Sequence, residues 1–545
     1  MLALALGACE GPPARPKPWR HAAEPTATAG AETSAAARLR ERAEAQAARR
    51  HTLRIRLEAD PTHLSPLLDP DVEGLRAVAG TVFEPLVVHA GGGDGVAPAL
   101  AESYRVTDGG TELRFVLRAG VTFHDGKPLT AADAQFSIDR ARGGLSRVPH
   151  LRRAFAAIAQ VDVWGPRDLR VRLRRPDGYV LRSLVDLPIV PAALYEAGDR
   201  ARNRAPVGTG PYRFVRWARG DRIVLARNDA YWGPRPAFDK VELVVVPDGA
   251  RALMLARQGD LDLVPAVVPE HWPAEATAPA TARELGLIRL QPAWLRFGAF
   301  NCRRAPFDDV RVRRAAALAV DRDKLARDVH RGLARPVAGP IFPGGPGDAP
   351  AAPPPTDPAV AAALLEEAGW HDGGGDGIRA KDGQKLRVVL VVLAGGDARA
   401  DAERDLVIAG LRRAGFWVEL RPGDRSTLAA RLQGGDFDLA LLDYRGRTDE
   451  SLAPIYGAAG ELNPGRCGSS AMDAALAAAA AREGPAARRP AVVEIARLAA
   501  EEQPLLPLVA PDPVGLVSKR LAPVAPWDGW LALAAFTPSE PASPR

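Results

Sequence analysis

The sequence predicts an α/β protein whose second half contains a doubly wound layer of parallel strands. Three strand-like segments, 385–393, 416–422 and 437–444, alternate with two helix-like segments, 397–415 and 425–435. A strand–helix–strand–helix–strand order is typical of parallel strands joined by crossover helices. The length of 545 residues is large for one hydrophobic core, so two or three domains are expected.

The composition is that of a globular protein, with 47% hydrophobic and 25% charged residues. The net charge is +6, but the basic residues are interspersed with acidic ones. Because a nucleic-acid-binding protein usually carries a basic stripe with aromatic residues, we expect no nucleic-acid partner. No apolar run approaches the roughly 20 residues that a membrane helix needs, so the body of the chain is not expected to span a bilayer.

The amino terminus resembles a lipoprotein signal. A short apolar run leads into Leu6-Gly7-Ala8-Cys9, which matches the small residues that precede the lipid-bearing cysteine of a bacterial lipobox. The basic region of a signal peptide is missing, so a start further upstream or a disordered tail are the alternatives. We interpret residues 1–9 as a signal remnant with lipid attachment at Cys9. Residues 10–50 are interpreted as a tether, Pro- and Ala-rich to residue 33 and then a solvated helical spacer. This predicts a periplasmic location, or one on the outer face of the cell membrane.

Paired strands are expected on both sides of Ala119-Gly120, since ELRFVLRAGVTFHDG (112–126) alternates apolar and polar residues. His124 and Asp125 look like an acid–base pair at first sight. Adjacent residues on a strand end point to opposite faces, however, and Asp125-Gly126 is a turn dipeptide. The structural interpretation is therefore favoured over the catalytic one.

A helix is expected from Ala131 to Arg140, because Thr130 and Asp133 have the spacing of a capping box. Later in the chain, Asp357-Pro358 is typical of the start of a helix through Glu367. Two cysteines remain besides Cys9, namely Cys302 and Cys467. They could pair in an exported protein, but their sequence separation leaves this open, and neither has a second Cys or His at metal-ligand spacing.

Segments along most of the chain carry a resemblance to a known family. They are APALAESYRVTDGG and its continuation (97–142), VGTGPYRFVRW and its continuation (207–264), FNCRRAPFDDV and its continuation (300–344), AAALLEEAGWHDG and its continuation (361–383) and GDFDLALLDY (435–444). In this order they resemble the bacterial extracellular solute-binding proteins of family 5, the dipeptide-, oligopeptide- and nickel-type capture components of ABC importers.

This resemblance implies a periplasmic-binding-protein-like class II fold, with two lobes, comprising three subdomains, around a ligand cleft. It implies a first-lobe core from 51–90, 208–295 and 500–545, an accessory domain from 91–207 and a second lobe from 296–499. It further implies a monomer without enzymatic activity or cofactor. The partners would be a peptide or other small solute and the permease and ATPase subunits of an importer.

The ligand candidates follow strand 437–442, since ligands of such sheets bind beyond the carboxyl ends of strands. They are Asp443, Tyr444, Arg445, Arg447 and Asp449. Peptide-binding members of the family usually have a tryptophan where this chain has Tyr444, and an ammonium-binding aspartate where it has Arg447. Because an arginine repels an ammonium group, either Asp443 or Asp449 takes over, or the ligand presents an anion or a neutral group; Arg447 pointing into solvent is the alternative.

Weaker ligand candidates are Asp69 and Asp71, which line the cleft or start turns, and Asn301. The segment Gly208–Tyr212 lacks the Lys-Ser/Thr of a phosphate loop, and the resemblance places it near the hinge, where glycines allow a sharp turn. Residues 372–383 have glycines where a calcium loop needs carboxylates, which favours a hairpin tip over a metal site. Trp217, Trp232 and Trp370 are expected in packing.

Two rival functions remain open. A hydrolase would need a nucleophile or metal with a base, and the chain has neither G-x-S-x-G nor H-E-x-x-H, with its nine histidines dispersed. A ligand-sensing module for a non-peptide solute, such as an oligosaccharide, an opine or a metal chelate, is harder to exclude because fold does not fix role.

Overall fold

The computed structural model describes residues 49–68, 74, 77–90, 95–143, 149–196, 204–290, 293–341, 353, 355–372, 374–395, 398–446, 449–523 and 536–539. The chain divides into two units, Met1–His51 and Thr52–Arg545. Of the first unit only residues 49–51 are described, so Cys9, the tether and nearly all of the spacer helix lie outside the described residues. In the described part of the chain we find no helix long and apolar enough to cross a membrane.

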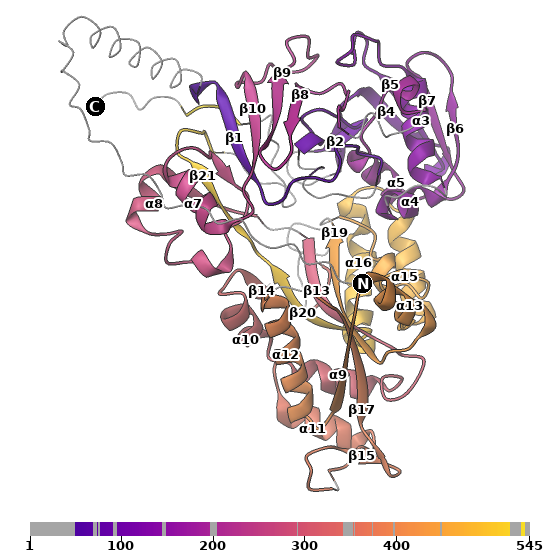
Figure 1. Ribbon diagram of the computed structural model, residues 1–545. Coiled ribbons are helices and arrows are strands. Elements are labelled where there is room, and N and C mark those ends of the chain that lie inside the picture. Colours follow the sequence, from indigo (N-terminus) through magenta and orange to yellow (C-terminus); the bar gives the residue numbers. More distant parts are fainter. Residues whose placement is uncertain are drawn as a thin grey trace, which may run out of the picture. The chain divides into compact units, whose positions relative to one another are not determined.

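The second unit contains a seven-stranded mixed sheet, in which the strands lie in the order β12–β21–β11–β1–β10–β9–β8 (Figure 1). Strand β1 runs parallel to β10 and β11, and every other neighbouring pair is antiparallel. The strands are β1 Thr52–Leu57, β8 Tyr212–Ala218, β9 Arg222–Arg227, β10 Lys240–Val245, β11 Leu263–Val264, β12 Leu285–Arg289 and β21 Val514–Ser518; helices α7 Gly249–Arg257 and α8 Pro279–Glu284 lie between them in sequence.

An antiparallel four-stranded sheet, β4–β5–β7–β6, lies within residues 91–207, the region expected to be the accessory domain. Its strands are β4 Ala101–Thr107, β5 Glu112–Leu117, β6 Ile158–Val163 and β7 Asp168–Leu173, and its helices are α3 Ala131–Arg142, α4 Pro149–Ala154, α5 Gly178–Ser183 and α6 Ala192–Tyr195. A hairpin of β2 Val87–His89 and β3 Val96–Pro98 precedes it.

A six-stranded sheet, β14–β20–β13–β19–β17–β18, forms the second half of the molecule. Strand β17 is parallel to both β18 and β19, which confirms the predicted parallel layer. The strands are β13 Ala293–Phe300, β14 Ala334–Pro336, β17 Arg387–Leu393, β18 Trp417–Gly423, β19 Leu439–Gly446 and β20 Leu505–Pro511; a separate hairpin pairs β15 Ala380–Lys381 with β16 Gln384–Lys385.

Helices pack on both faces of this sheet. They are α9 Val310–Ala319, α10 Arg322–Lys324, α11 Pro358–Glu367, α12 Ala398–Arg413, α13 Arg425–Gly434, α14 Ala453–Tyr456, α15 Ser470–Ala480 and α16 Pro485–Glu502. The helix start predicted at Asp357-Pro358 is confirmed, because the Asp357 carboxylate accepts from the backbone N–H groups of Ala359 and Val360.

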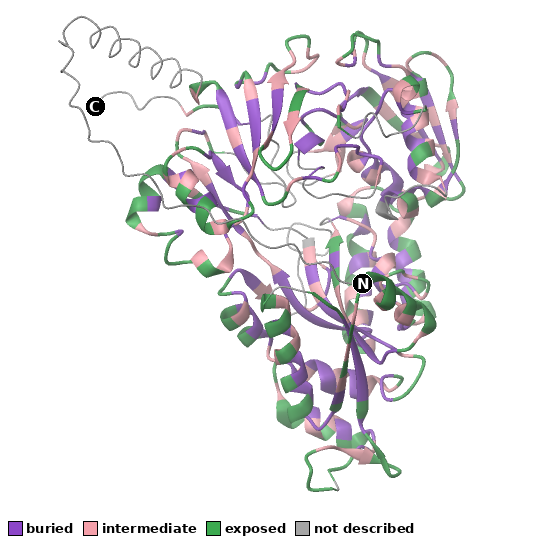
Figure 2. Cartoon of the chain, viewed as in Figure 1, coloured by how far each residue is buried: buried purple, intermediate pink, exposed green. Residues whose placement is uncertain are grey.

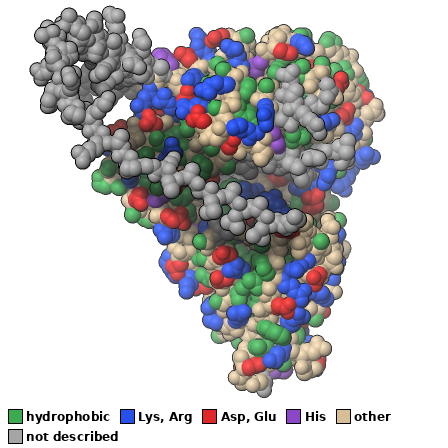
Figure 3. Space-filling model, viewed as in Figure 1, with side chains coloured by type: hydrophobic (Ala, Val, Ile, Leu, Met, Phe, Trp, Pro, Cys, Tyr) green, Lys and Arg blue, Asp and Glu red, His purple; other side chains and the backbone are tan. Residues whose placement is uncertain are grey.

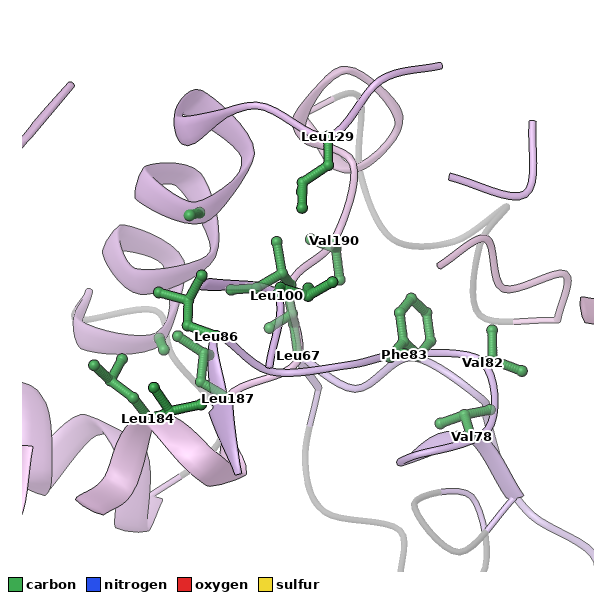
Figure 4. Close-up of a cluster of buried hydrophobic side chains, with 14 of the residues drawn as sticks. Leu67, Val78, Val82, Phe83, Leu86, Leu100, Leu129, Leu184, Leu187 and Val190 are labelled. Carbon is green, nitrogen blue, oxygen red and sulfur yellow. The ribbon is translucent and has the colours of Figure 1, made fainter. Parts of the chain in front are cut away.

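The buried side chains fall into separate cores. One cluster joins Leu53 and Leu243 of the seven-stranded sheet to Phe115 and Val171 of the four-stranded sheet, so the accessory domain shares a core with the first lobe. Figure 4 shows part of it, where Leu86, Leu100, Leu187 and Val190 converge. Two further clusters occupy the two faces of the six-stranded sheet. Strands β17 and β20 are accordingly buried along most of their length, while the outer helix faces are exposed (Figure 2).

The chain crosses between the seven- and six-stranded sheets twice, from β12 to β13 and from β20 to β21. The two crossing segments are bonded to each other, since the Leu290 N–H donates to the Pro513 carbonyl at 2.9 Å. Arg289 Nη1 also lies 3.3 Å from Asp512 Oδ2. Two crossings held together at one place are typical of a hinge between lobes.

Two domain boundaries drawn from the sequence differ from the sheets. Residues 505–511 were expected in the first lobe, but this strand, β20, pairs with β13 and β14 of the six-stranded sheet. Likewise β13 begins at Ala293, before the expected boundary at 295. The reason is that β20 is buried nearly throughout, and an all-apolar strand carries no sequence signal for the sheet that it joins.

Candidate functional site

The strand β19 ends where the sequence predicted a ligand site. Successive side chains of a strand alternate between faces, so Asp443 and Arg445 lie on one face and Tyr444 on the other. The partner strand β13 pairs Arg296 with Asp443 and Trp294 with Arg445. Because β13 starts directly after a crossing segment, this end of the sheet lies beside the hinge (Figure 1).

Asp443 is engaged in a charge cluster. Its carboxylate forms an ion pair with Arg296, whose Nε also donates to Glu403 Oε2 at 2.8 Å. Glu403 is 3% exposed and its Oε1 lies 2.8 Å from His330 Nε2. Burial alone would raise the pKa of Glu403, but the contact with His330 and the charge of Arg296 outweigh it and hold that pKa below its usual value.

Tyr444 belongs to the core of the second lobe. It is 5% exposed and packs in the same cluster as Leu295, on the face opposite Asp443. Its hydroxyl donates to Glu450 Oε2 at 3.4 Å, and burial raises the pKa of that hydroxyl. A methyl group on Gly446 would lie 2.2 Å from the Tyr444 hydroxyl oxygen, so the glycine makes room for the ring. Tyr444 therefore offers a ligand little surface in this conformation.

Asp449 also forms a buried ion pair, with Arg488. Arg488 Nη1 donates to Asp449 Oδ1 at 2.8 Å and to Oδ2 at 2.6 Å, and both side chains are buried. The Arg488 guanidinium lies 4.3 Å from the ring centroid of Tyr179, in the accessory domain. The two acids that could have replaced the family's ammonium-binding aspartate are thus both paired with arginines.

Asn301 holds the backbone of the second lobe together. It is 2% exposed, and its Nδ2 donates to the carbonyl of Phe437 at 2.8 Å and to that of Gly435 at 3.3 Å. The adjacent Cys302 forms a disulfide with Cys467, with the two Cα atoms 5.1 Å apart, which settles the pairing that the sequence left open. These contacts give Asn301 a structural role, and its predicted ligand contact stays a prediction.

Arg445 differs from its neighbours on the strand. It is exposed, and its guanidinium carbon lies 4.5 Å from the centre of the Trp294 ring. Trp294 and Arg296 were not predicted from the sequence. Only the antiparallel register of β13 against β19, which no local pattern reveals, places them beside Arg445 and Asp443. The remaining candidates, Asp69, Asp71 and Arg447, lie outside the described residues.

The polar segment around His124 is structural, as the sequence favoured. His124 Nε2 lies 3.0 Å from the Gly210 carbonyl oxygen, and the Gly208 N–H donates to Nδ1 at 3.4 Å. Burial lowers the pKa of His124, so the neutral ring fits this pair of contacts. Both ring nitrogens are used in joining the turn at His124 to residues 208–210. The strand expected after Gly120 is reduced to an isolated bridge between Thr122 and Pro128, because the turn at Asp125-Gly126 follows at once.

The structure gives a different reason for the two glycines in Gly208–Tyr212 from the sharp turn expected from the sequence. Neither Gly208 nor Gly210 has a positive φ. Instead, a Cβ on Gly208 would lie 2.0 Å from the Val82 carbonyl oxygen, and one on Gly210 would lie 2.3 Å from that of Thr81. Close approach of two backbones, rather than a sharp turn, requires glycine here.

The capping box at Thr130 is confirmed. The Thr130 N–H donates to Asp133 Oδ2 at 2.9 Å, and the Thr130 hydroxyl donates to the same oxygen at 2.8 Å. We expect Thr130→Ala to lower the free energy of unfolding by about 1 kcal/mol, as loss of a helix cap does. Urea denaturation would measure this, and solute binding should not change; an unchanged midpoint would show that the cap does not contribute.

Residues 380–385 form a hairpin at the end of the segment that was compared with a calcium loop. Asp382 and Gly383 have φ values of 49° and 76°, as a tight two-residue turn requires, and Asp376 Oδ2 lies 2.7 Å from Lys385 Nζ. The described residues contain no group of three or more His, Cys, Asp or Glu side chains that could hold a metal ion.

On the face of the molecule seen in Figure 3, basic and acidic side chains are interspersed.

The two lobes also touch away from the hinge. A Cβ on Gly178, at the start of α5, would lie 2.2 Å from the carbonyl oxygen of Arg482, in the loop between α15 and α16. Tyr179 is 6% exposed beneath Arg488. Arg153 of the accessory domain forms an ion pair with Glu461. The region expected to be the accessory domain and the second lobe are therefore in direct contact.

Fold and site together define a two-lobed binding protein of class II, and comparison with known proteins gives the family. Residues 95–463 match the model of the bacterial extracellular solute-binding proteins, family 5, and the chain belongs to that family. It is 30% identical over 470 residues to Protein XP55 of Streptomyces lividans, covering 81% of this chain and 80% of that protein. It is also 30% identical over 377 residues to the nickel-binding periplasmic protein of Escherichia coli, covering 66% of this chain and 69% of that protein.

A solved structure confirms the fold. The oligopeptide-binding protein AppA of Bacillus subtilis, in complex with a nonapeptide, superposes with a TM-score of 0.72 at 23% identity, covering 90% of this chain and 99% of that chain. The family consists of binding proteins rather than enzymes, and its members act outside the cytoplasm as extracellular or periplasmic proteins.

Proposed function

We propose that this chain is the solute-binding component of an ABC importer and captures an oligopeptide or a similar small solute by hinge closure. The observation that carries the proposal is the pair of bonded crossing segments between two sheets, in a chain that belongs to a family of solute-binding proteins. Closure would bury the solute between the lobes, and the closed form would deliver it to the permease subunits. A solute shifts the equilibrium only through its higher affinity for the closed state.

The contact between the accessory domain and the second lobe supports closure. Tyr179 and Arg488 lie on opposite lobes, and separating the lobes would expose both side chains to water. The closed state therefore has contacts of its own besides those with a solute. Such a contact already favours the closed form, so a smaller difference between the solute's affinities for the closed and open forms is enough to close the lobes.

The solute is proposed to be peptide-like, although relatives differ in what they bind. One relative is the nickel-binding periplasmic protein of Escherichia coli, and one similar solved structure holds a nonapeptide. The second candidate is a sensing protein for a non-peptide solute, because the two acids beside the predicted peptide-ammonium position are both paired with arginines. A hydrolase is disfavoured, since His124, the residue that first suggested acid–base chemistry, uses both ring nitrogens structurally.

The cellular setting is proposed from the sequence. We infer that Cys9 carries a lipid and that residues 10–50 tether a monomeric binding protein to the outer face of a cell membrane. With the strand assignments above, the proposed first lobe comprises the seven- and four-stranded sheets and the proposed second lobe the six-stranded sheet.

Native mass spectrometry of gently purified protein tests the function. We expect a small solute to co-purify, and small-angle scattering to give a larger radius of gyration once mild unfolding and refolding has removed it. Re-addition should restore the compact form. If no solute co-purifies and no peptide mixture changes the radius, capture by closure is wrong. A chemically altered solute would favour the hydrolase, and unchanged uptake of the identified solute in cells lacking this chain would favour sensing.

A further inference from the structure

One face of the β13–β19 pair carries an aromatic residue and three charged residues at the end of the sheet beside the hinge. Register pairs Trp294 with Arg445 and Arg296 with Asp443, and the two-residue period of a strand places all four on the same face. The opposite face carries Leu295 and the buried Tyr444. This four-residue face is separate from the core and lies next to the crossing into the first lobe.

The two arginines of this face have different partners. Arg296 is shared between two carboxylates, those of Glu403 and Asp443, so its positive charge is matched. Arg445 has no carboxylate partner among the residues that the structure describes, and its guanidinium carbon lies 4.5 Å from the centre of the Trp294 ring. Within the described part of the chain, Arg445 is thus an exposed arginine that lies over an indole ring and has no acidic partner for its N–H groups.

Stacking on an indole suits an arginine for recognition. The ring attracts the guanidinium through its face and restricts the side chain, while the N–H donors in the guanidinium plane stay available at its edge. Those donors match the two oxygens of a carboxylate in a bidentate arrangement. Trp294 and Arg445 together therefore have the chemistry of a carboxylate receptor.

The pairing of the nearby acids also favours a carboxylate receptor. The two acids expected to bind a peptide ammonium group already have arginine partners, since Asp443 is paired with Arg296 and Asp449 with Arg488. We propose, on the basis of the function proposed above, that the solute of this chain is a carboxylate-bearing anion whose carboxylate binds Arg445 stacked on Trp294. Recognition then depends on the solute's carboxylate and not on a free ammonium group.

The test uses a mixed library of di- to tetrapeptides in three forms: both termini free, amino terminus acetylated, and carboxyl terminus amidated. Titration calorimetry and native mass spectrometry follow binding to the full chain. The acetylated form should bind at least as tightly as the free form, and the amidated form about 10- to 100-fold more weakly, as expected for loss of a charge-assisted pair.

Arg445→Gln should weaken binding of both carboxylate forms by about the same factor and leave the amidated form unchanged. Trp294→Leu should act in the same direction, because it removes the surface that orients Arg445. The matched control is Arg216→Gln, an exposed arginine on β8 of the seven-stranded sheet, which should bind all forms like the parent protein.

The outcomes separate this inference from the proposed function. If the parent protein binds free and amidated peptides equally and Arg445→Gln changes neither, the carboxylate receptor is wrong while peptide capture stands. If acetylation abolishes binding, an ammonium site exists and the inference is likewise overturned. If no form binds or changes the radius of gyration, the proposed peptide-like function fails and the inference fails with it.

Discussion

Arg488→Met is expected to lower the free energy of unfolding by about 3–5 kcal/mol, as breaking a buried ion pair from one side does. Arg488 is 2% exposed and donates to both carboxylate oxygens of Asp449, which is 7% exposed. Methionine fills much of the same volume but leaves the Asp449 carboxylate buried without a partner. Chemical denaturation followed by circular dichroism measures the change.

The matched control lies on the same helix. Arg497 is half-exposed on α16 and pairs with Glu494 and Glu501 on the surface. Arg497→Met should therefore change the free energy of unfolding by no more than about 0.5–1 kcal/mol. Equal costs for the two methionine variants would show that the Asp449–Arg488 pair is not buried in solution.

A third variant separates stability from closure. Tyr179→Leu keeps the Asp449–Arg488 pair but removes the aromatic ring beneath the guanidinium, on the opposite lobe. We expect a small effect on the second lobe's stability and a shift of the solute-free protein toward the open form, measured as a larger radius of gyration. A radius equal to that of the parent protein would show that this contact does not favour closure.

Local sequence patterns predicted much of the fold. The parallel order of β17, β18 and β19 followed from alternating strand and helix segments, and the helix starts at Thr130 and Asp357 followed from capping residues. These signals lie within a few residues of the element that they specify. The family resemblance then supplied the arrangement of lobes, which no local pattern contains.

The candidate site was predicted less completely, because its side chains are defined by distant partners. Asp443 follows a strand as expected, yet its availability depends on Arg296, 147 residues away in sequence. Asp449 depends in the same way on Arg488, and Arg445 on Trp294. The sheet membership of β20 is a similar case, since an apolar strand fits either lobe until its neighbours are known.

The double variant Cys302→Ser/Cys467→Ser is expected to lower the free energy of unfolding by about 2–5 kcal/mol. The disulfide spans a sequence separation of 165 residues, so in the chain-entropy account it strongly restricts the unfolded state. The folded backbone should keep its geometry without the bond. The Cys302 N–H donates to the Gly465 carbonyl at 3.1 Å, and the Cys467 N–H donates to Asn463 Oδ1 at 2.9 Å.

Because these backbone contacts remain, the loss should arise mainly in the unfolded ensemble, which gains extent when the cross-link is removed. The dependence of unfolding free energy on urea should therefore steepen in the double variant, as more surface becomes exposed on unfolding. A reductant should lower the midpoint of the parent protein to that of the double variant and leave the double variant unmoved. If the reductant shifts both proteins equally, or neither, Cys302 and Cys467 are not joined in the folded protein.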